Sequence, residues 1–466
     1  MKVLLISVNR ERMPYPVYPL GLAYISGDLL KYGHQVYGLD LCLTDHPKKE
    51  IIRSIEDKKP DLIGLSLRNL DNLTYPDSIS YLKEAKDIVE ICHKKGDLPV
   101  VIGGSGFSLS PKKILTEIKA DYGIVGEGEG VLSALIRRIE GKNDSYLDNL
   151  ISFEDGLLKK SLKASSFDLP DRRVFNPIPY FEQGGMINIQ TKRGCPFSCI
   201  YCTYPIIEGK NLRLREISSI IYEIKMITTS FSIDYIYFVD DIFNFPPDYA
   251  KSLCKAIINE GIKIRWTGFV NPAFFDEELA TYMKKAGCAG LEFGIDSGDE
   301  IMLKNLNKRF SIEDILKASH ICKKVGLPFA YYLILGGPGE NHKTLKNSFI
   351  MMDKLTPTAV IAMVGIRIYP GTKLAEKAYH DGIIKKNDDL IYPKFYISKE
   401  LKDEIIPIIY EEAMKRRNWI VPGLKINITQ NMMEMIRRFK IKGPLWDLIG
   451  KMKRPRINPL GNERKK

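Results

Sequence analysis

The sequence lacks any long apolar segment. Hydrophobic residues make up 44% of its 466 positions, yet no run reaches the roughly 18 to 20 apolar residues that a membrane-spanning helix needs. We therefore expect no such helix. The apolar run within residues 1–10 is also too short for the core of a signal sequence, and it predicts a first β-strand instead.

Cysteines at paired spacings are missing as well. The eight cysteines show no pattern typical of a disulfide framework, and this favours a reducing compartment. Because no signal sequence is expected either, we predict a cytoplasmic protein. Five cysteines mostly lie in apolar contexts, as buried core thiols do; they are Cys42, Cys92, Cys254, Cys288 and Cys322.

Net positive charge is small outside the C-terminal end. The net charge of the chain is +12, but residues 425–466 alone hold twelve Lys or Arg against three acidic residues, a net charge of +9. The remainder is therefore close to neutral, at about +3, and its composition does not indicate a nucleic-acid partner.

Three cysteines do follow a short spacing. Cys195, Cys199 and Cys202 form a C-x3-C-x2-C pattern directly after an apolar run at residues 186–190. Cysteine thiolates hold iron–sulfur clusters, and a cubane cluster ordinarily takes four of them. Three ligands would leave one iron open, and an open position distinguishes a reactive metal site from a structural one. The alternatives are unrelated core thiols, or a zinc site that lacks a nearby fourth Cys or His.

Residues 1–145 alternate apolar runs with helical patterns, which predicts a doubly wound parallel sheet. Such sheets bind ligands outside the carboxyl ends of their strands, where several glycine-rich or polar loops fall. Glycine is common in such turns whatever they bind, so a ligand site and plain loops both remain open. The expected strands are residues 3–8, 35–40, 62–67, 100–103 and 122–125, with helices such as 20–32 and 78–94 between them.

Residues 146–184 predict a connector, because prolines interrupt any regular period. Residues 185–385 then repeat strand–helix units. Six such units predict a partial (β/α)6 barrel rather than a complete eightfold one, with functional groups at the carboxyl ends of the strands. The expected strands are residues 186–190, 235–240, 262–269, 290–295, 329–335 and 360–368, and the expected helices include 215–228, 247–259, 276–286 and 312–324.

Residues 386–466 show no strand pattern and predict a mainly helical, basic C-terminal region. Residues 432–440 combine Met, Ile and Phe with Arg and Lys in one amphipathic helix. Such a helix can pack on the barrel with its charges in solvent, or it can lie on an anionic membrane surface. The second interpretation would suit a lipid substrate, and both stay open.

The cysteine motif, with the aromatic Tyr201 before its last cysteine, resembles the radical S-adenosylmethionine (SAM) superfamily, in which SAM binds the open iron. The segments 18–24, 103–104 and 126–129 resemble the cobalamin-binding domain of the class B branch. The resemblance implies a [4Fe-4S] cluster on Cys195, Cys199 and Cys202, together with SAM and cobalamin. The cobalamin contacts that it implies are Pro19, Gly21, Arg68, Asn69, Gly103, Gly104, Ser105, Gly126 and Glu127.

Four segments of the barrel half match family motifs in the family order. Residues 238–244 match the segment near the SAM amino group, residues 292–298 the ribose segment, and residues 335–340 the turn beside the adenine; residues 369–372 form the fourth. In the second segment, Asp296 replaces the usual glutamate. The SAM contacts that these matches imply are Tyr201, Asp240, Glu292, Asp296, Ser297, Gly336 and Gly337.

One family signature is absent. Class B proteins that ligate cobalt through histidine carry D-x-H-x-x-G, whereas here Asp40 is followed by Leu41 and Cys42, and His46 is out of register. The resemblance therefore implies cobalamin with no histidine beneath the metal. Arg68 is our candidate for the residue that faces cobalt on that side.

The resemblance implies an enzyme that cleaves SAM to a 5′-deoxyadenosyl radical, abstracts hydrogen from an unactivated carbon and methylates that carbon from methylcobalamin. It also implies an external electron donor of the flavodoxin or ferredoxin type. The alternatives are a non-methylating radical SAM enzyme, such as a cyclase or a ring-rearranging enzyme, and a cobalamin or redox sensor. A sensor needs no SAM site, so the barrel motifs argue against it. We expect a small-molecule or lipid substrate, which the sequence does not identify further. It also does not identify a catalytic acid or base or the oligomeric state.

Overall fold

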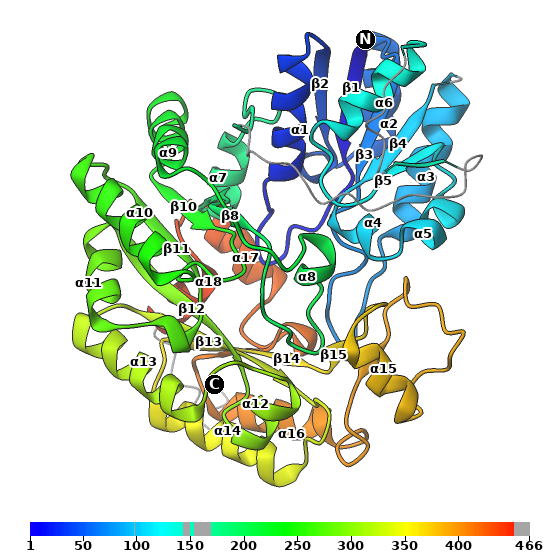
Figure 1. Cartoon of the computed structure of the whole chain (residues 1–466). Helices are drawn as coiled ribbons and strands as arrows, with labels where there is room; N and C mark the ends of the chain where they lie inside the picture. Colours follow the sequence, from blue (N-terminus) through cyan, green and yellow to red (C-terminus); the bar gives the residue numbers. More distant parts are fainter. Residues whose placement is uncertain (97, 143–149, 153–168, 452–466) are drawn as a thin grey trace, which may run out of the picture.

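The computed structural model describes residues 1–96, 98–142, 150–152 and 169–451. Two largely parallel sheets dominate it, the first at the upper right of Figure 1 and the second at the lower left. This confirms the predicted α/β class and the order of the two halves. None of the described helices is long and apolar enough to cross a membrane.

The first sheet has the strand order β2-β1-β3-β4-β5-β6, in which only the edge strand β6 is antiparallel. The five predicted strands are confirmed, and β6 is an addition from the predicted connector. The strands are β1 (Lys2–Ser7), β2 (Gln35–Asp40), β3 (Leu62–Ser66), β4 (Val100–Gly103), β5 (Tyr122–Ile124) and β6 (Leu150–Ser152).

Helices cover both faces of this sheet, and the alternation of β1 shows why. Val3 and Leu5 belong to the core beneath α1 (Leu20–Lys31) and α6 (Val131–Ile139), whereas Leu4 and Ile6 belong to the core on the opposite face. A strand buried on both faces reads as a continuous apolar run, as β1 does. The second face is covered by α2 (Pro47–Lys58), α3 (Leu82–Lys95) and α5 (Pro111–Ile118).

The second sheet is open and parallel, with the order β17-β14-β13-β12-β11-β10-β7. It contains the six predicted strands and a seventh. Its strands are β7 (Ile187–Ile189), β10 (Tyr235–Phe238), β11 (Arg265–Val270), β12 (Cys288–Asp296), β13 (Phe329–Leu335), β14 (Ala359–Val364) and β17 (Trp419–Ile420). The helices between them are α9 (Ile217–Phe231), α10 (Pro247–Asn259), α11 (Glu277–Lys285), α12 (Glu300–Asn305), α13 (Ile312–Val325) and α14 (His342–Leu355).

Two details of the sheet correct the sequence-based prediction. The last predicted strand breaks at Gly365, which has φ +70°, and continues as β15 (Ile366–Arg367), which pairs antiparallel with β16 (Phe395–Tyr396). Because β16 and β17 come from residues 386–466, the prediction of a C-terminal region without strands is wrong. Both strands are two residues long, too short to produce a recognisable sequence pattern.

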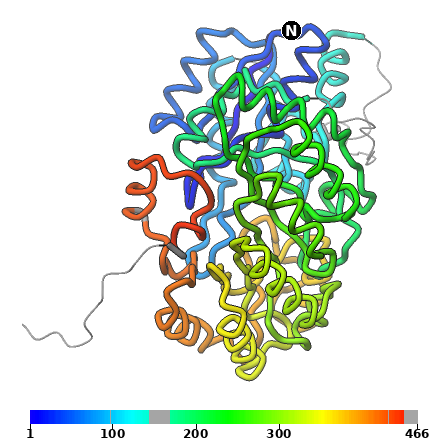
Figure 2. Tube along the Cα trace, turned by 90° about the vertical axis from the view of Figure 1, so that its left-hand side faces the viewer, coloured from blue at the N-terminus to red at the C-terminus, as the bar shows by residue number. Residues whose placement is uncertain are grey.

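The C-terminal helices pack against the second sheet. Met433 and Ile436 of α17 (Gln430–Arg438) and Trp446 of α18 (Leu445–Lys451) are buried in one cluster with residues of β13 and β14. A Cβ atom at Gly290 would lie only 2.5 Å from the Trp446 ring, so Trp446 is inserted beside β12. Figure 2 shows these helices on one side of the molecule, where the two halves meet. The packing interpretation is thus correct for the buried face of α17.

The described part of the predicted connector is packed rather than exposed. Arg172 pairs with Glu223 of α9 at 2.6 Å, with both side chains 0% exposed, and the Tyr18 hydroxyl donates to the Phe175 carbonyl at 2.8 Å. The sequence predicted a connector here, but α9 supplies a buried partner for Arg172. One hydrophobic cluster consequently runs from the first sheet into the second.

Candidate cofactor site

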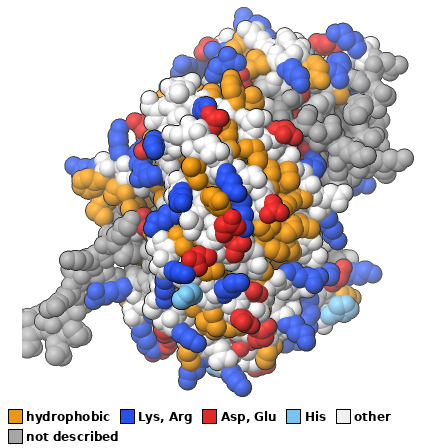
Figure 3. Space-filling view, turned by 60° about the vertical axis from the view of Figure 1, so that its left-hand side comes forward, with side chains coloured by type: hydrophobic (Ala, Val, Ile, Leu, Met, Phe, Trp, Pro, Cys, Tyr) orange, Lys and Arg blue, Asp and Glu red, His pale blue; other side chains and the backbone are white. Residues whose placement is uncertain are grey.

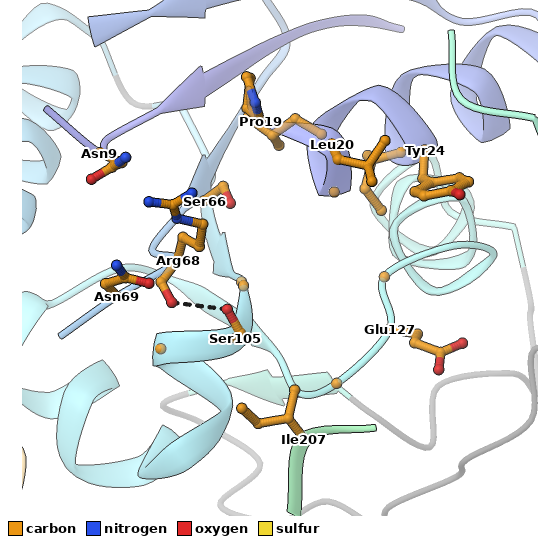
Figure 4. Close-up of a pocket in the computed structure, with 18 of the residues that line it drawn as sticks. Asn9, Pro19, Leu20, Tyr24, Ser66, Arg68, Asn69, Ser105, Glu127 and Ile207 are labelled. Atoms are coloured by element: carbon orange, nitrogen blue, oxygen red, sulfur yellow. Dashed lines mark hydrogen bonds between the residues drawn. The ribbon is translucent and has the colours of Figure 1, made fainter. Parts of the chain in front are cut away.

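A cavity of about 610 Å³ lies between the two sheets. Residues that follow β1, β3, β4 and β5 line it on one side, and Asn188, Gln190 and Val239, at the carboxyl ends of β7 and β10, line it on the other. Figure 4 shows the N-terminal loops around this space, with Pro19, Leu20 and Tyr24 opposite Arg68 and Ser105. Both halves therefore present strand carboxyl ends to one cavity.

All nine residues that we predicted as cobalamin contacts line this cavity: Pro19, Gly21, Arg68, Asn69, Gly103, Gly104, Ser105, Gly126 and Glu127. Glycine is required at Gly104, which has φ +104° and where a Cβ atom would lie 2.6 Å from the Leu67 carbonyl oxygen. The Ser105 hydroxyl donates to the Arg68 carbonyl at 2.8 Å and ties two of the loops together.

Arg68 has an unusual environment within the cavity wall. Its Nε atom is buried without a hydrogen-bond partner, and burial lowers the pKa of its guanidinium. No histidine is among the residues that line the cavity; His46 is exposed at the start of α2. Asp40 accepts a hydrogen bond from the Tyr180 hydroxyl at 2.6 Å and another from the Cys42 backbone at 3.1 Å. The described residues thus place a cation, and no imidazole, at this wall.

Glu127 lines the cavity, but its carboxylate is paired with the second half of the chain. Arg193 and Arg213 each approach it at 2.9 Å, and Arg193 also contacts Glu129 at 2.6 Å. Burial opposes ionisation, but hydrogen bonds and charge from the two arginines outweigh it and lower the pKa of Glu127. These ion pairs join the cobalamin-side loop to residues on both sides of the cysteine motif, and no sequence motif indicated them.

The cysteine loop is held by the segment that follows it. Glu208 accepts a hydrogen bond from the Gly194 backbone at 2.9 Å, and the Cys195 backbone donates to the Gly209 carbonyl at 3.0 Å. From the same segment, Tyr204, Ile207 and Glu208 line the cavity. The loop of Cys195, Cys199 and Cys202 is thereby connected to the cavity.

Cys195 is buried, and Cys199 and Cys202 are partly exposed. Burial raises the pKa of Cys195 to about 12 and raises the pKa values of Cys199 and Cys202 as well. Thiolates are the ligand form, so a metal that binds here must displace their protons. Among the described residues, no three His, Cys, Asp or Glu side chains converge on a point that one metal ion could occupy.

The two adjacent acids after β10, Asp240 and Asp241, differ in their hydrogen-bond partners. Asp240 accepts hydrogen bonds from the Thr191 backbone at 2.7 Å and from the Thr191 hydroxyl at 2.5 Å, and it lies 3.5 Å from the Lys192 ammonium. Both oxygens of Asp241 are buried without a hydrogen-bond partner, beside Cys195. Burial, and then the charge of Glu208, raise the pKa of Asp241. Asp240 was the predicted SAM contact, yet Asp241 is the acid with unused oxygen atoms.

The structure brings Tyr201 and Asp296 together but keeps Glu292 apart. The Tyr201 hydroxyl donates to Asp296 at 2.5 Å, and the Lys308 ammonium donates to the same oxygen at 2.8 Å. Glu292 instead accepts hydrogen bonds from the Tyr237 hydroxyl and the Trp446 indole N–H. Sequence reasoning missed Lys308, because no motif that we recognised included it.

The remaining predicted SAM contacts lie in neighbouring turns. The Ser297 hydroxyl is 3.0 Å from that of Ser348 on α14, and both side chains are buried. The backbone N–H groups of Gly336 and Gly337 donate to Glu340, which closes the turn after β13. These groups therefore already have protein partners.

Comparison with known proteins agrees with this arrangement. Residues 6–136 match the B12 binding domain and residues 189–351 match the radical SAM superfamily. The chain is 26% identical to an uncharacterised methyltransferase of Pyrococcus horikoshii, over 82% of this chain and 84% of that protein. It is 22% identical to tryptophan 2-C-methyltransferase of Streptomyces laurentii, over 79% of this chain and 73% of that protein.

Among solved structures, the chain resembles the radical SAM methyltransferase TsrM of Kitasatospora setae with cobalamin and a [4Fe-4S] cluster bound. The TM-score is 0.85 at 21% identity, with 97% of each chain covered, and this likeness concerns the fold. The chain belongs to the cobalamin-dependent radical SAM enzymes, in which a B12 binding domain precedes a radical SAM domain. It is an enzyme of their methyltransferase family, whose cofactors are a [4Fe-4S] cluster, SAM and cobalamin.

The residues present fit these cofactors. Cys195 is buried beside Asp241, and Cys199 and Cys202 are only partly exposed. Three such thiols would hold an iron cluster with one open position for SAM. Glycine-lined loops and an unpaired guanidinium nitrogen border the neighbouring cavity.

Proposed function

We propose that this methyltransferase acts on an unactivated carbon of a small-molecule or lipid substrate, bound between the two sheets. The single observation that carries the proposal is the shared cavity, whose wall includes both the cobalamin-side loops and the segment after Cys202. When bound, cobalamin supplies a methyl carrier and the cluster supplies the electron that cleaves SAM. The chain supplies position, charge and the exclusion of water.

On the cobalamin side, the glycine loops allow the backbone to approach a large flat ligand. We propose that Arg68 would contact bound cobalamin from the cavity wall, where no histidine is available to ligate cobalt. The support is its burial, its unpaired Nε atom and its position in the cavity wall. Arg68→Ala should change the absorption spectrum of bound cobalamin, whereas Arg53→Ala, at an arginine that is 67% exposed, should leave it unchanged. A spectrum of histidine-ligated cobalt in the wild type would overturn this assignment.

On the cluster side, we propose that Cys195, Cys199 and Cys202 hold the cluster and that Asp241 binds the amino group of SAM. An ammonium group would supply the partner that the buried carboxylate lacks. Asp240 would act indirectly, because its hydrogen bonds fix the backbone of Thr191 before the cysteine loop. Tyr201 and Asp296 would lie at the ribose side.

An external one-electron donor of the flavodoxin or ferredoxin type is part of this proposal. The cysteines outside the motif are Cys42, Cys92, Cys254, Cys288 and Cys322, and all five are buried in the hydrophobic core. This confirms their expected structural role. They offer no second cluster within the described residues that could relay electrons.

The second candidate function is radical cyclisation without methyl transfer. It is kept because a relative, from Cereibacter sphaeroides, is named anaerobic magnesium-protoporphyrin IX monomethyl ester cyclase. A lipid substrate is kept because another, from Methylococcus capsulatus, is named hopanoid C-3 methylase. The cavity itself does not separate these substrate classes.

The test uses the full chain, loaded anaerobically with cluster and cobalamin, reduced and given SAM with a deuterated methyl group. Candidate small molecules and lipids are added separately. A product heavier by one labelled methyl group supports methyl transfer. Formation of 5′-deoxyadenosine with an unlabelled, altered product supports the cyclase alternative. If neither product forms, the remaining interpretation is a cobalamin or redox sensor.

A further inference from the structure

The loop between α12 and α13 contacts the cysteine loop through two side chains. The Asn307 side chain donates to the Ser198 carbonyl at 2.6 Å, and the Lys308 ammonium lies 3.5 Å from the Tyr201 hydroxyl. Ser198 and Tyr201 both lie between cysteines of the motif. This loop therefore fixes where Lys308 stands relative to the proposed cluster.

Lys308 is buried together with one acid. Its ammonium contacts Asp296 at 2.8 Å, and the two side chains are only 8% and 4% exposed. Lys308 also interacts electrostatically with Cys199 and Cys202, and Asp296 with Cys199. Charges in such a poorly solvated region are weakly screened, so each acts on the neighbouring thiolates more strongly than a surface charge would.

We infer that the Lys308–Asp296 pair sets the reduction potential of the cluster held by Cys195, Cys199 and Cys202. Reduction transfers one electron from the external donor to the cluster and adds one negative charge to the site. Net charge and hydrogen bonding near the sulfurs are known controls of such potentials. Lys308 favours the added charge and Asp296 opposes it, so the two residues act with opposite signs. The inference rests on the proposed ligand assignment.

The experiment compares wild type, Lys308→Met, Asp296→Asn and the charge-conserving Lys308→Arg. Lys304→Met is the matched control, because Lys304 is exposed on the neighbouring helix α12. Each full-length protein is reconstituted anaerobically and titrated with dithionite at pH 8, without SAM, while the reduced cluster is followed by electron paramagnetic resonance. Omitting SAM separates the potential from any effect on SAM binding.

Lys308→Met should lower the potential and Asp296→Asn should raise it, each by at least a tenfold change in the reduction equilibrium, about 59 mV for a one-electron couple. Lys308→Arg and Lys304→Met should match wild type. Equal potentials in all variants, or shifts of both single variants in the same direction, would overturn the inference, since lost packing alone does not produce opposite signs. A wild-type chain that takes up no iron would instead refute the ligand assignment.

Discussion

The two sides of the cavity use their polar residues differently. On the cobalamin side, every residue predicted from the loops lines open space. On the cluster side, each predicted acid already has a protein partner. Asp240 and Glu292 accept hydrogen bonds from Thr191 and Tyr237, and Asp296 forms an ion pair with Lys308. The difference follows from chemistry, because glycine loops bind through backbone shape, whereas a buried carboxylate must find a donor wherever the fold provides one.

The variant with the largest expected effect tests whether the two sides of the cavity bind their cofactors independently. Replacing Cys195, Cys199 and Cys202 together by Ala should abolish iron binding and all SAM cleavage, because no other cysteine of the described chain is placed to substitute. Cobalamin uptake should persist, since the nine cavity-lining residues are unchanged. Iron analysis and absorption spectra measure both. Full iron content in the triple variant would refute the assignment, and loss of cobalamin would show that the sides are coupled.

Trp446→Ala tests whether the C-terminal region belongs to the cluster side. Trp446 is 2% exposed, and its indole N–H donates to Glu292 at 2.7 Å. Removing it should cost about 3–5 kcal/mol of stability through the cavity left behind, and it also removes one donor from a buried carboxylate. Urea denaturation measures the change. Phe439→Ala, at a ring that is 67% exposed, is the control and should have little effect.

The same contact predicts how a shortened chain behaves. Cutting the chain after Pro422 removes Met433, Ile436 and Trp446 from the cluster that covers β13 and β14. We therefore expect the truncated protein to be unstable rather than merely deprived of a basic tail. A truncated protein with wild-type resistance to urea would contradict this placement of the helices.

Glu340 should give the cluster side its own pH dependence. Burial raises the pKa of Glu340 to about 7 in the folded state, although hydrogen bonds from Gly336 and Gly337 oppose the shift. Between roughly pH 4.5 and 7 the folded protein keeps a proton that the unfolded chain releases, so stability should fall as pH rises through this window, by on the order of 3 kcal/mol. Glu340→Gln should remove this slope, as measured by urea denaturation at several pH values. An identical slope in both proteins would assign it to other groups.

Asp241→Asn and Asp240→Asn should separate ligand binding from loop support. Asp241→Asn should weaken SAM binding to the cluster-loaded protein by about tenfold, or 1.4 kcal/mol. Stability should change little, because the Cys195 thiol and the Tyr204 hydroxyl lie beside its carboxylate without forming a well-aligned hydrogen bond. Asp240→Asn should mainly lower stability, because it removes the charge that Lys192 and the Thr191 hydroxyl face. Titration calorimetry and urea denaturation measure the two effects. The reverse pattern would return the SAM contact to Asp240.

The smallest expected effect concerns the outer face of α17 and the residues after it. Met435, Phe439 and Ile441 are 43%, 67% and 38% exposed beside Arg438 and Lys440. Figure 3 shows apolar side chains with Lys and Arg at the left edge of the molecule. If the substrate is a lipid, the protein should sediment with anionic liposomes at low salt and be released at high salt, each basic residue contributing about 1 kcal/mol.

Phe439→Glu with Ile441→Glu should weaken this sedimentation without disturbing the buried face of α17. This double variant is preferable to a truncation, because it leaves Trp446 in place. Equal sedimentation of wild type and variant, or of neither, would leave α17 as a packing helix and remove the argument for a lipid substrate.

Local sequence was sufficient for the longer strands of both sheets and for the positions of the loops that follow them. The apolar runs of β1, β4 and β13 could be predicted because a strand buried on both faces has a continuous apolar pattern. Strand β17 could not be predicted, because two residues are too few to show an alternating pattern and because its pairing with β14 forms only in the folded chain. The amphipathic pattern of α17 was visible in the sequence. The sequence did not show that half of its apolar residues would be buried against the second sheet.

By itself, the sequence determined the class of the protein, because the cysteine spacing and the glycine loops act through neighbouring residues. Tertiary structure decided which charged groups have partners. Trp446 reaches Glu292 across 154 residues and Arg193 reaches Glu129 across 64; Arg172, which lies in the predicted connector, is buried against Glu223. Desolvation makes an unpaired buried charge costly, and only the completed fold determines which charges are buried and which partner each one meets.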